Sequence, residues 1–474
     1  MNDPDIPVFA IIGHPNEGKS SVVSTLTGDD RIPISPIPGE TIRNERVSWK
    51  AHGREMIQFV DTPGFQNPLR TLKWFEENAS DHEGLLDRFL KEFAHVPGFD
   101  HDCELLKPLA EGAGVVFVAD GSRPIGKTDL AEMEILRLAG NPRMGVINSK
   151  SDLPDYLENW KREFRKHFNA TFLFDACRAS FRNRIELLES LKNIEQNWNP
   201  PLEKAIAQIR SDREGKRKRT ADLIFEELEH SLVYKKSRLL ADEHNSEVVK
   251  EELENAFREG LRSIEERTWD RILKEFNHTR LNVSVAREPV LSEDLFSDQT
   301  WQVLGLNGKQ LALSAAALGG GAGVGLDVLF GGISFGVFAA SGAVTGAIAA
   351  LLKDRSLAKL KLKRIPIGGY EISIGPNQNP QFPFILLDRA FLLYQMIANR
   401  AHARQDKEAT FTEEATKVGP CSQWSPSQRS VCVDVINAIK SGKRTKLDDL
   451  RPRFTEILLE TLIELEESQN VFEK

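Results

Sequence analysis

The fold of this chain is decided by the stretch GHPNEGKS, which runs from Gly13 to Ser20. It matches the pattern G-x-x-x-x-G-K-[ST] and lies between an apolar run at residues 8–12 and a helix-like run at residues 20–26. A buried strand in front and a helix behind are the surroundings in which this pattern forms a phosphate-binding loop. The stretch therefore predicts a strand, a phosphate-binding loop and a helix, in that order.

The residue types of this loop fit the binding of a nucleotide with Mg²⁺. Backbone N–H groups of the loop and of the following helix start would surround the phosphates. Lys19 would bring a positive charge to the β and γ oxygens, and the Ser20 hydroxyl would bind Mg²⁺. The residues expected to contact the nucleotide here are Asn16, Glu17, Gly18, Lys19, Ser20 and Ser21.

Two further motifs carry the rest of the expected site. Asp61-Thr62-Pro63-Gly64 follows an apolar run at residues 56–60, which places Asp61 at the end of a strand, where a carboxylate can hold Mg²⁺ through water. Gly64 would offer its backbone N–H to the γ-phosphate. Thr41, at the end of Pro38-Gly39-Glu40-Thr41, would bind Mg²⁺ only while the γ-phosphate is present, and so would act as a switch. The expected catalytic set is Lys19, Thr41 and Gly64.

These motifs resemble those of small GTPases of the TrmE–Era–EngA type, over roughly residues 5–198. That family reads guanine with the motif N-K-x-D. Here Ser149, Lys150 and Asp152 stand at the matching positions, and Asn148 stands one place early. Ala176, in the loop after the strand-like residues 171–174, would offer its backbone N–H to the base. The resemblance implies GTP and GDP as ligands, Mg²⁺ as cofactor and hydrolysis of GTP as the activity.

The resemblance also bears on how hydrolysis would occur. Phe65 stands directly after Gly64, where many GTPases place a glutamine that orients the attacking water, so catalysis must come from elsewhere. Asn16 stands where potassium-activated members use an asparagine to hold K⁺ against the phosphates, in place of an arginine finger. The alternative, an asparagine kept for loop geometry, stays open because Ile42 and Arg43 replace the aspartate that the family has after Thr41. A nucleotide-dependent homodimer would accompany this mechanism.

Bulk composition limits the class of protein. The 474 residues predict two to four domains, and the contents of 40% hydrophobic and 28% charged residues are ordinary for a globular chain. The net charge of −8 argues against DNA as a partner and makes RNA an unfavoured one. No secretory signal is recognisable near Met1, and the four cysteines show no zinc-ligand spacing. We expect a protein that faces the cytosol.

The alternation of apolar and helix-like runs predicts an α/β P-loop GTPase domain with a doubly wound, mostly parallel sheet. Residues 65–113 form an insertion with helix-like patterns at 69–78 and 85–93, either a nucleotide-responsive surface or an extra cover on the sheet. A mainly α C-terminal region follows, with long helices over residues 202–278, a β-hairpin at 359–374 and helices at 383–404, 427–439 and 447–468. The basic run at residues 216–219 fits a solvated helix face better than a phosphate-binding patch.

Residues 311–352 are the second unusual stretch, because Asp327 is their only charged residue and ten of them are glycine. Glycines four apart let two helices approach closely in lipid, and about 63 Å of helix would cross a hydrocarbon core of about 30 Å twice. A basic segment at residues 353–364 follows, as expected beside anionic lipid on the cytoplasmic side. The other interpretation is a glycine-rich hairpin buried in a soluble domain.

The sequence thus predicts a GTPase domain at 1–198, long helices at 199–300, a glycine-rich hairpin at 301–365 and a helical domain at 366–474. We interpret the chain as a nucleotide-driven switch that acts at the cytoplasmic face of the cell membrane. Two alternatives are a dynamin-like GTPase that remodels membranes and a soluble GTPase of ribosome or RNA assembly. Pathway, activator and oligomeric state are not encoded in any motif.

Overall fold

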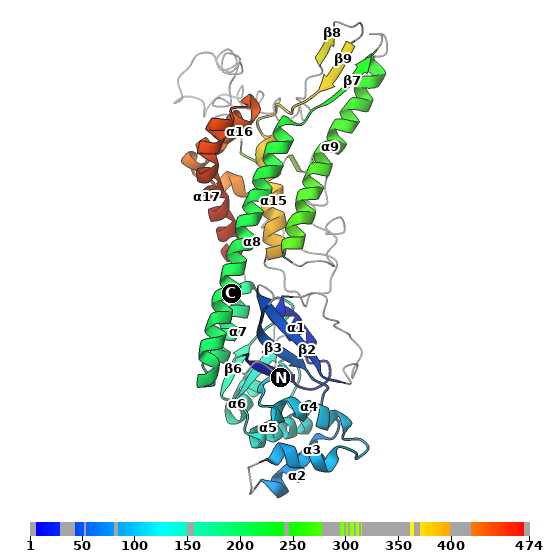
Figure 1. Ribbon diagram of the computed structural model, residues 1–474, viewed down its shortest axis with the longest axis vertical. Coiled ribbons are helices and arrows are strands. Elements are labelled where there is room, and N and C mark those ends of the chain that lie inside the picture. The colour runs from blue at the N-terminus through cyan, green and yellow to red at the C-terminus, as the bar shows by residue number, and fades with distance from the viewer. Residues whose placement is uncertain are drawn as a thin grey trace. The chain divides into compact units, whose positions relative to one another are not determined.

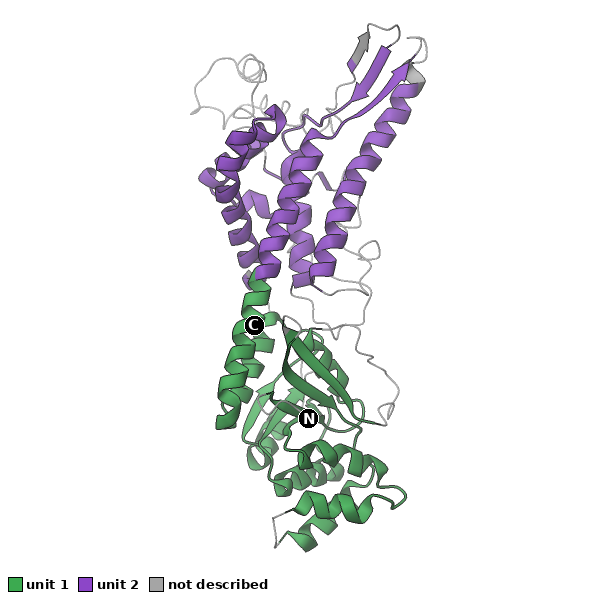
Figure 2. Ribbon diagram, viewed as in Figure 1, with its two compact units in different colours: residues 1–214, 277–280, 399–406 green, residues 215–276, 281–398, 407–474 purple. Residues whose placement is uncertain are grey.

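The structure is a computed structural model in which the chain divides into two compact units (Figures 1 and 2). The first unit comprises residues 1–214, 277–280 and 399–406, and the second comprises residues 215–276, 281–398 and 407–474. The structure describes residues 6–28, 43–51, 54–79, 84–148, 156–240, 246–276, 294–297, 300–301, 304–307, 310–311, 314, 361–364, 370–398 and 419–468.

A six-stranded sheet forms the centre of the first unit (Figure 1). Its strands lie in the order β2-β3-β1-β4-β5-β6, and only β2 runs antiparallel to its neighbour. The middle strands are buried apolar runs, as a sheet covered on both faces requires. The bounds are β1 (Val8–Ile12), β2 (Glu45–Ala51), β3 (Arg54–Asp61), β4 (Gly114–Asp120), β5 (Arg143–Asn148) and β6 (Ala170–Leu173).

Helices cover both faces of this sheet, so the prediction of a doubly wound, mostly parallel α/β domain is confirmed. Side chains of α1 (Lys19–Thr27), α7 (Phe181–Lys192) and the start of α8 (Asn199–Val233) share one core with β1, β3 and β4. The core on the other face contains side chains of α2 (Pro68–Asn78), α3 (Leu85–Phe93), α4 (Asp100–Ala110), α5 (Lys127–Ala139) and α6 (Leu157–His167). A short 3-10 turn, η1 (Gln196–Trp198), precedes α8.

The insertion after β3 contains α2 and α3, near the predicted positions, and also α4, which the sequence pattern did not indicate. The buried carboxylate of Asp102, on α4, holds the start of the insertion. It accepts hydrogen bonds from the backbone N–H groups of Gln66 (3.0 Å) and Asn67 (3.2 Å) and from the Thr71 hydroxyl (2.8 Å). One of these bonds satisfies the N–H of Asn67, the N-cap residue of α2, which has no partner within the helix. The insertion is therefore built onto the domain from its first residue.

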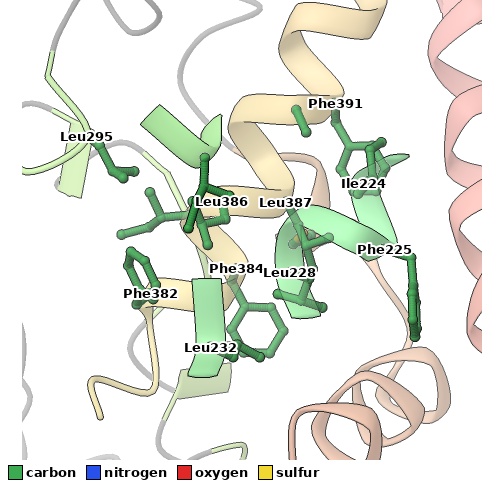
Figure 3. Close-up of a cluster of buried hydrophobic side chains, with 14 of the residues drawn as sticks. Ile224, Phe225, Leu228, Leu232, Leu295, Phe382, Phe384, Leu386, Leu387 and Phe391 are labelled. Atoms are coloured by element: carbon green, nitrogen blue, oxygen red, sulfur yellow. The ribbon is translucent and has the colours of Figure 1, made fainter. Parts of the chain in front are cut away.

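The second unit is mainly helical, which confirms the predicted C-terminal region. Its core joins α8 to the wholly buried α15, through Ile224 and Leu228 on α8 and Phe384, Leu387 and Phe391 on α15 (Figure 3). A three-stranded antiparallel sheet of order β7-β9-β8 contains the predicted hairpin, β8 with β9. The bounds are β7 (Lys236–Leu240), α9 (Ser246–Glu275), β8 (Lys361–Arg364), β9 (Tyr370–Ile374), α15 (Phe382–Ala398), η5 (Pro420–Gln423), α16 (Pro426–Ser441) and α17 (Arg444–Ser468).

The basic run at residues 216–219 lies on α8 and makes contacts within the second unit. The Arg219 guanidinium pairs with Glu275 at 2.6 Å, and that of Arg217 lies 3.5 Å from Glu466. Two of its cations are thus engaged by acids of the protein itself, as on an ordinary helix face.

The glycine-rich segment at residues 311–352 lies outside the described residues, apart from Leu311 and Ser314. Within the described part of the chain, no helix combines the length and the apolar character that crossing a bilayer demands. The chain forms two compact units, and the first boundary between them falls after residue 214. The division into four domains stays a prediction.

Candidate functional site

The carboxyl ends of four neighbouring parallel strands bring the site residues to one edge of the sheet. β1 ends at Ile12, directly before the phosphate loop, and β3 ends at Asp61. The register pairs Ile11 of β1 with Asp61 of β3, and Asp120 of β4 with Asn148 of β5. In open α/β sheets the crevice outside these strand ends is the usual ligand site.

Backbone conformation at three loop positions turns the chain from β1 into α1. Gly13 has a φ of +150°, and a Cβ there would lie 2.1 Å from the Val118 carbonyl oxygen, so no other residue fits against β4. Gly18 has a φ of 95° directly before Lys19, the first residue of α1. Asn16 is exposed and has a φ of 68°, in the left-handed region that asparagine tolerates best after glycine. The loop therefore has the compact shape that wraps a phosphate.

The Lys19 ammonium lies over the phosphate loop. Its Nζ donates hydrogen bonds to the carbonyl oxygens of Gly13 (2.9 Å) and His14 (3.2 Å). The residue is only 9% exposed, so the charge is held inside the curve of the loop. A phosphate oxygen entering this curve would meet a cation that is already placed.

Ser20 and Asp61, two of the three predicted Mg²⁺ ligands, lie side by side. The Ser20 hydroxyl donates to Asp61 Oδ2 at 2.6 Å, while the buried Asp61 Oδ1 has no hydrogen-bond partner in the described part of the protein. Burial raises the pKa of Asp61 above the ordinary carboxyl value, and the hydrogen bond from Ser20 and the charge of Lys19 oppose this. An orphaned carboxylate oxygen beside a hydroxyl fits a hard cation with oxygen ligands. The residues present therefore fit Mg²⁺.

The motif Asp61-Thr62-Pro63-Gly64 packs directly against the phosphate loop. A Cβ at Gly64 would lie 2.9 Å from Pro15 Cδ, and the Thr62 hydroxyl donates to the Ile11 carbonyl oxygen at 2.8 Å. Gly64 thus brings its backbone next to the loop because it has no side chain. The Phe65 ring is 6% exposed and belongs to the core beneath the insertion, so it does not take the place of a water-orienting side chain.

Asn148 joins the phosphate loop to the loop after β6. Its Nδ2 donates to the Glu17 carbonyl oxygen at 2.9 Å, and its Oδ1 accepts from the Ala176 backbone N–H at 3.1 Å. The Thr25 hydroxyl, on α1, donates to the Ala176 carbonyl oxygen at 2.8 Å. The backbone N–H of Ala176, which we expected to face the base, is engaged by Asn148 in this structure. Asn148 stands one residue before the position where the family motif has its asparagine. Its side chain therefore holds both the phosphate loop and the loop after β6.

We expect Asn148→Ala to weaken nucleotide binding about tenfold, because two buried hydrogen bonds of about 0.5–1.5 kcal/mol each hold the two loops in place. Titration of a fluorescent GDP analogue measures the change, with the melting temperature recorded alongside. Ser149→Ala tests the other candidate position; if Asn148 takes the asparagine role, this variant should change affinity less than about twofold, a difference of about 0.4 kcal/mol. A larger effect of Ser149→Ala than of Asn148→Ala would mean that residue 149, and not Asn148, takes the place of the asparagine in the N-K-x-D motif.

Four of the predicted site residues lie outside the described residues: Thr41, Ser149, Lys150 and Asp152. Their roles as switch residue, base-reading residues and Mg²⁺ ligand stay predictions. The structure brings the other predicted contacts, from Asn16 to Ser21, together with Asp61 and Gly64 at one edge of the sheet.

The sequence pattern gave no signal for a charged network beneath the phosphate loop. The Arg123 guanidinium pairs with Glu17 (2.5 Å) and with both oxygens of Asp129 (2.7 Å each). His14 Nδ1 lies 3.4 Å from Glu132 Oε1, and this hydrogen bond raises the pKa of His14. Arg123 and Glu17 are 106 residues apart, and His14 and Glu132 are 118 residues apart, so only the fold brings these partners together.

The class of this domain follows from the site and from comparison with known proteins. Residues 8–149 match the family model described as "50S ribosome-binding GTPase". With the strand order, the phosphate loop and the Ser20–Asp61 pair, this match makes the N-terminal domain a P-loop GTPase domain of the TrmE–Era–EngA type. Residues 161–463 match the model described as "Domain of unknown function (DUF3482)". That match covers more than half of the chain, so the chain belongs to this family.

Individual relatives resemble the first part of the chain. GTPase Der of Brucella ovis is 34% identical over 159 residues, which cover 31% of this chain and 28% of that protein. GTPase Der of Desulforudis audaxviator is 38% identical over 130 residues, covering 26% and 28%. The chain thus spans little more than a quarter of the length of the curated relatives that it matches.

Solved structures with a similar fold include two of Era. Era in complex with MgGDPNP and a segment of 16S ribosomal RNA is 22% identical, with a TM-score of 0.31, over 40% of this chain and 57% of that one. Aquifex aeolicus Era bound to GDP and aluminium fluoride is 19% identical, with a TM-score of 0.30, over 50% and 74%.

Proposed function

We propose that this protein binds GTP together with Mg²⁺ and hydrolyses it to GDP and phosphate, as a nucleotide-driven switch. The observation that carries the proposal is the Ser20–Asp61 pair beside a phosphate loop whose lysine is already in place. Ser20 and Asp61 would hold the metal, which neutralises charge on the phosphates when it is bound. Lys19 would hold the β and γ oxygens, and the backbone N–H of Gly64, which lies against the phosphate loop, would contact the γ-phosphate. Thr41 is proposed as the residue that responds to loss of that phosphate.

The choice of guanine rests on Lys150 and Asp152 and is tested by competition. We expect unlabelled GTP to displace a fluorescent GDP analogue at least about 100-fold more effectively than ATP, because a carboxylate accepting from both ring N–H groups would lose its partners with adenine. Asp152→Asn should shift the preference towards xanthosine nucleotides, whose ring offers an acceptor there. Equal displacement by ATP and GTP would contradict the guanine assignment.

A potassium ion is proposed as the further charge that assists hydrolysis. The support is Asn16, exposed on the phosphate loop, together with the burial of Phe65, since no side chain at position 65 orients water. Phosphate release should be faster in KCl than in NaCl of equal concentration, and the difference should shrink in Asn16→Ala. Equal rates in the two salts, at protein concentrations that allow dimers, would leave an external activator as the source of the missing charge.

The site of action is proposed to be the cytoplasmic face of the cell membrane, with anionic lipid as the partner. The support is the sequence of residues 311–352 and the basic residues that follow, among them Lys361, at the exposed start of β8. In lipid the backbone must be helical and glycines become contact surfaces between helices, whereas in water ten glycines disfavour a helix. A dynamin-like remodelling activity would add nucleotide-dependent assembly on vesicles to this attachment.

Deleting residues 311–352 is expected to move the protein from the membrane fraction to the soluble fraction after carbonate washing, with GDP binding unchanged. Vesicles with anionic lipid should retain the full-length protein and release the deletion variant. A full-length protein that stays monodisperse without detergent and ignores such vesicles would contradict attachment. Co-sedimentation with ribosomal particles would instead favour ribosome assembly, which the description of the matched GTPase family makes a compatible function.

A further inference from the structure

The phosphate loop contains an acid whose charge opposes the ligand. Glu17 stands two residues before Lys19, and its side chain is only 4% exposed. One of its carboxylate oxygens accepts a hydrogen bond from the Asp120 backbone N–H, at the end of β4. A buried carboxylate in a loop that must receive polyphosphate would repel the ligand, because charges interact strongly where water is excluded. The loop therefore needs a cation that balances Glu17.

Arg123 supplies that cation from the loop between β4 and α5. Its Nε lies 2.5 Å from Glu17 Oε1, while Nη1 and Nη2 form a two-point contact with Asp129 at 2.7 Å each. The hydrogen bonds that Arg123 donates to Asp129, together with the nearby charge of Glu17, raise the pKa of Arg123, so the guanidinium stays charged. A planar fork of donors suits two carboxylates at once better than an ammonium does.

The rest of the domain holds this arginine in place. Its guanidinium lies 5.4 Å from the centre of the Trp160 ring, and Trp160 Nε1 donates to the Arg123 carbonyl oxygen at 2.8 Å. Asp129 is 1% exposed and also accepts from the Gly126 backbone N–H at 2.7 Å, at the start of α5. Three elements thus fix Arg123: the phosphate loop, the start of α5 and the buried indole of α6.

We propose that Arg123 is a positioning residue for phosphate binding: it neutralises Glu17 and ties the phosphate loop to the start of α5, so that the loop can accept a polyphosphate. The inference rests on the proposed function. Because Arg123 acts on the ligand through Glu17, the loss of nucleotide affinity in Arg123→Ala should be largest while position 17 carries a charge. This dependence separates a positioning role from a merely structural one.

The test is a double-mutant cycle on the full-length protein, read out by titration of a fluorescent GDP analogue. Arg123→Ala should weaken binding of the GDP analogue about tenfold or more, since charged residues in direct contact are energetically coupled. Adding Glu17→Gln to Arg123→Ala should recover most of the loss. Arg123→Lys, which keeps the charge without the fork, should fall between the wild type and Arg123→Ala.

Arg137→Ala is the matched control. Arg137 makes an equally short two-point contact with Glu134, and both residues lie on α5, away from the phosphate loop. Its affinity should equal that of the wild type. An unchanged affinity in Arg123→Ala would overturn the inference, and so would a loss that Glu17→Gln does not restore. If Arg123→Ala fails to fold, Arg123→Lys and Arg123→Lys with Glu17→Gln complete the same cycle. Absence of guanine-nucleotide binding in the wild type would instead contradict the proposed function.

Discussion

Replacing Lys19 with alanine is expected to abolish measurable binding of GTP and GDP, a loss of at least about 100-fold. Nζ already lies within the curve of the loop, on the Gly13 and His14 carbonyl oxygens, and would exchange these for phosphate oxygens. Hydrogen bonds to charged groups contribute about 1.5–3 kcal/mol each, and each 1.4 kcal/mol is a factor of ten in affinity. Titration of a fluorescent GDP analogue measures the loss directly.

Lys127→Ala is the matched control for this experiment. Lys127 is an exposed lysine at the first position of α5, in the same unit, and its removal should leave affinity unchanged. The melting temperature of Lys19→Ala should stay close to that of the wild type, because the lysine packs against the loop rather than into either core of the unit. Retention of affinity within about threefold, some 0.6 kcal/mol, would mean that another cation binds the phosphates.

Replacing Arg389 with alanine is expected to cause the largest loss of stability in the second unit, about 3–5 kcal/mol. Arg389, on α15, is 3% exposed and contacts both oxygens of Glu265 on α9, at 2.5 and 3.1 Å. Glu227, on α8, is also buried, and its Oε1 has no hydrogen-bond partner among the described residues. The variant would leave two carboxylates inside the unit without this cation.

Chemical denaturation of the full-length protein measures this loss, and acid should reduce it. Burial and the neighbouring Glu265 raise the pKa of Glu227 well above its ordinary value, so Glu227 takes up a proton in the folded state at a pH where the unfolded chain has released it. Folding is therefore favoured as the pH falls through that window, and a protonated carboxyl no longer needs the arginine. We therefore expect the loss of unfolding free energy in Arg389→Ala to be smaller at pH 5 than at pH 8.

Arg444→Ala serves as the control, since Arg444 pairs with Glu229 on the surface, where its side chain is 77% exposed. Such a pair contributes at most about 1 kcal/mol. Nucleotide binding should be retained in both variants at denaturant-free conditions, because neither residue lies in the first unit. Equal losses in the two variants would show that the buried pair does not stabilise the second unit specifically.

The elements that could be predicted from the sequence are those whose own residues determine them. β1 is a continuous apolar run, so its position was predicted to the residue. β2 was missed although Glu45–Ala51 alternates polar with apolar residues, which is the pattern of a strand with one buried face. β7 was missed because four of its five residues are exposed, and it is a strand only through pairing with β9, more than 120 residues later.

The same distinction holds for the site. The phosphate loop and Asp61 are local motifs with a fixed chemistry, and the structure places them together. The Asn148 bridge spans 131 residues and the Arg123–Glu17 pair spans 106, so no window of sequence contains both partners. Glu17 in particular appeared to be one more backbone donor of the loop. Its side chain has a separate role that only the fold reveals.

The start of α8 has a consequence for how this protein can be divided. Leu202, Ala205, Ile206 and Ile209 are buried in a core shared with β1 and β4, beyond the residue where the family resemblance to small GTPases ends. A fragment that ends at residue 198 would lack these side chains and expose the core that they cover. A fragment that starts at residue 161 would separate β6 from β5, the strand that it pairs with. The first unit therefore contains residues of both matched regions, and recombination at either limit would disrupt its core. An expression fragment of the GTPase domain should extend to about residue 214, where the first and longest segment of the first unit ends.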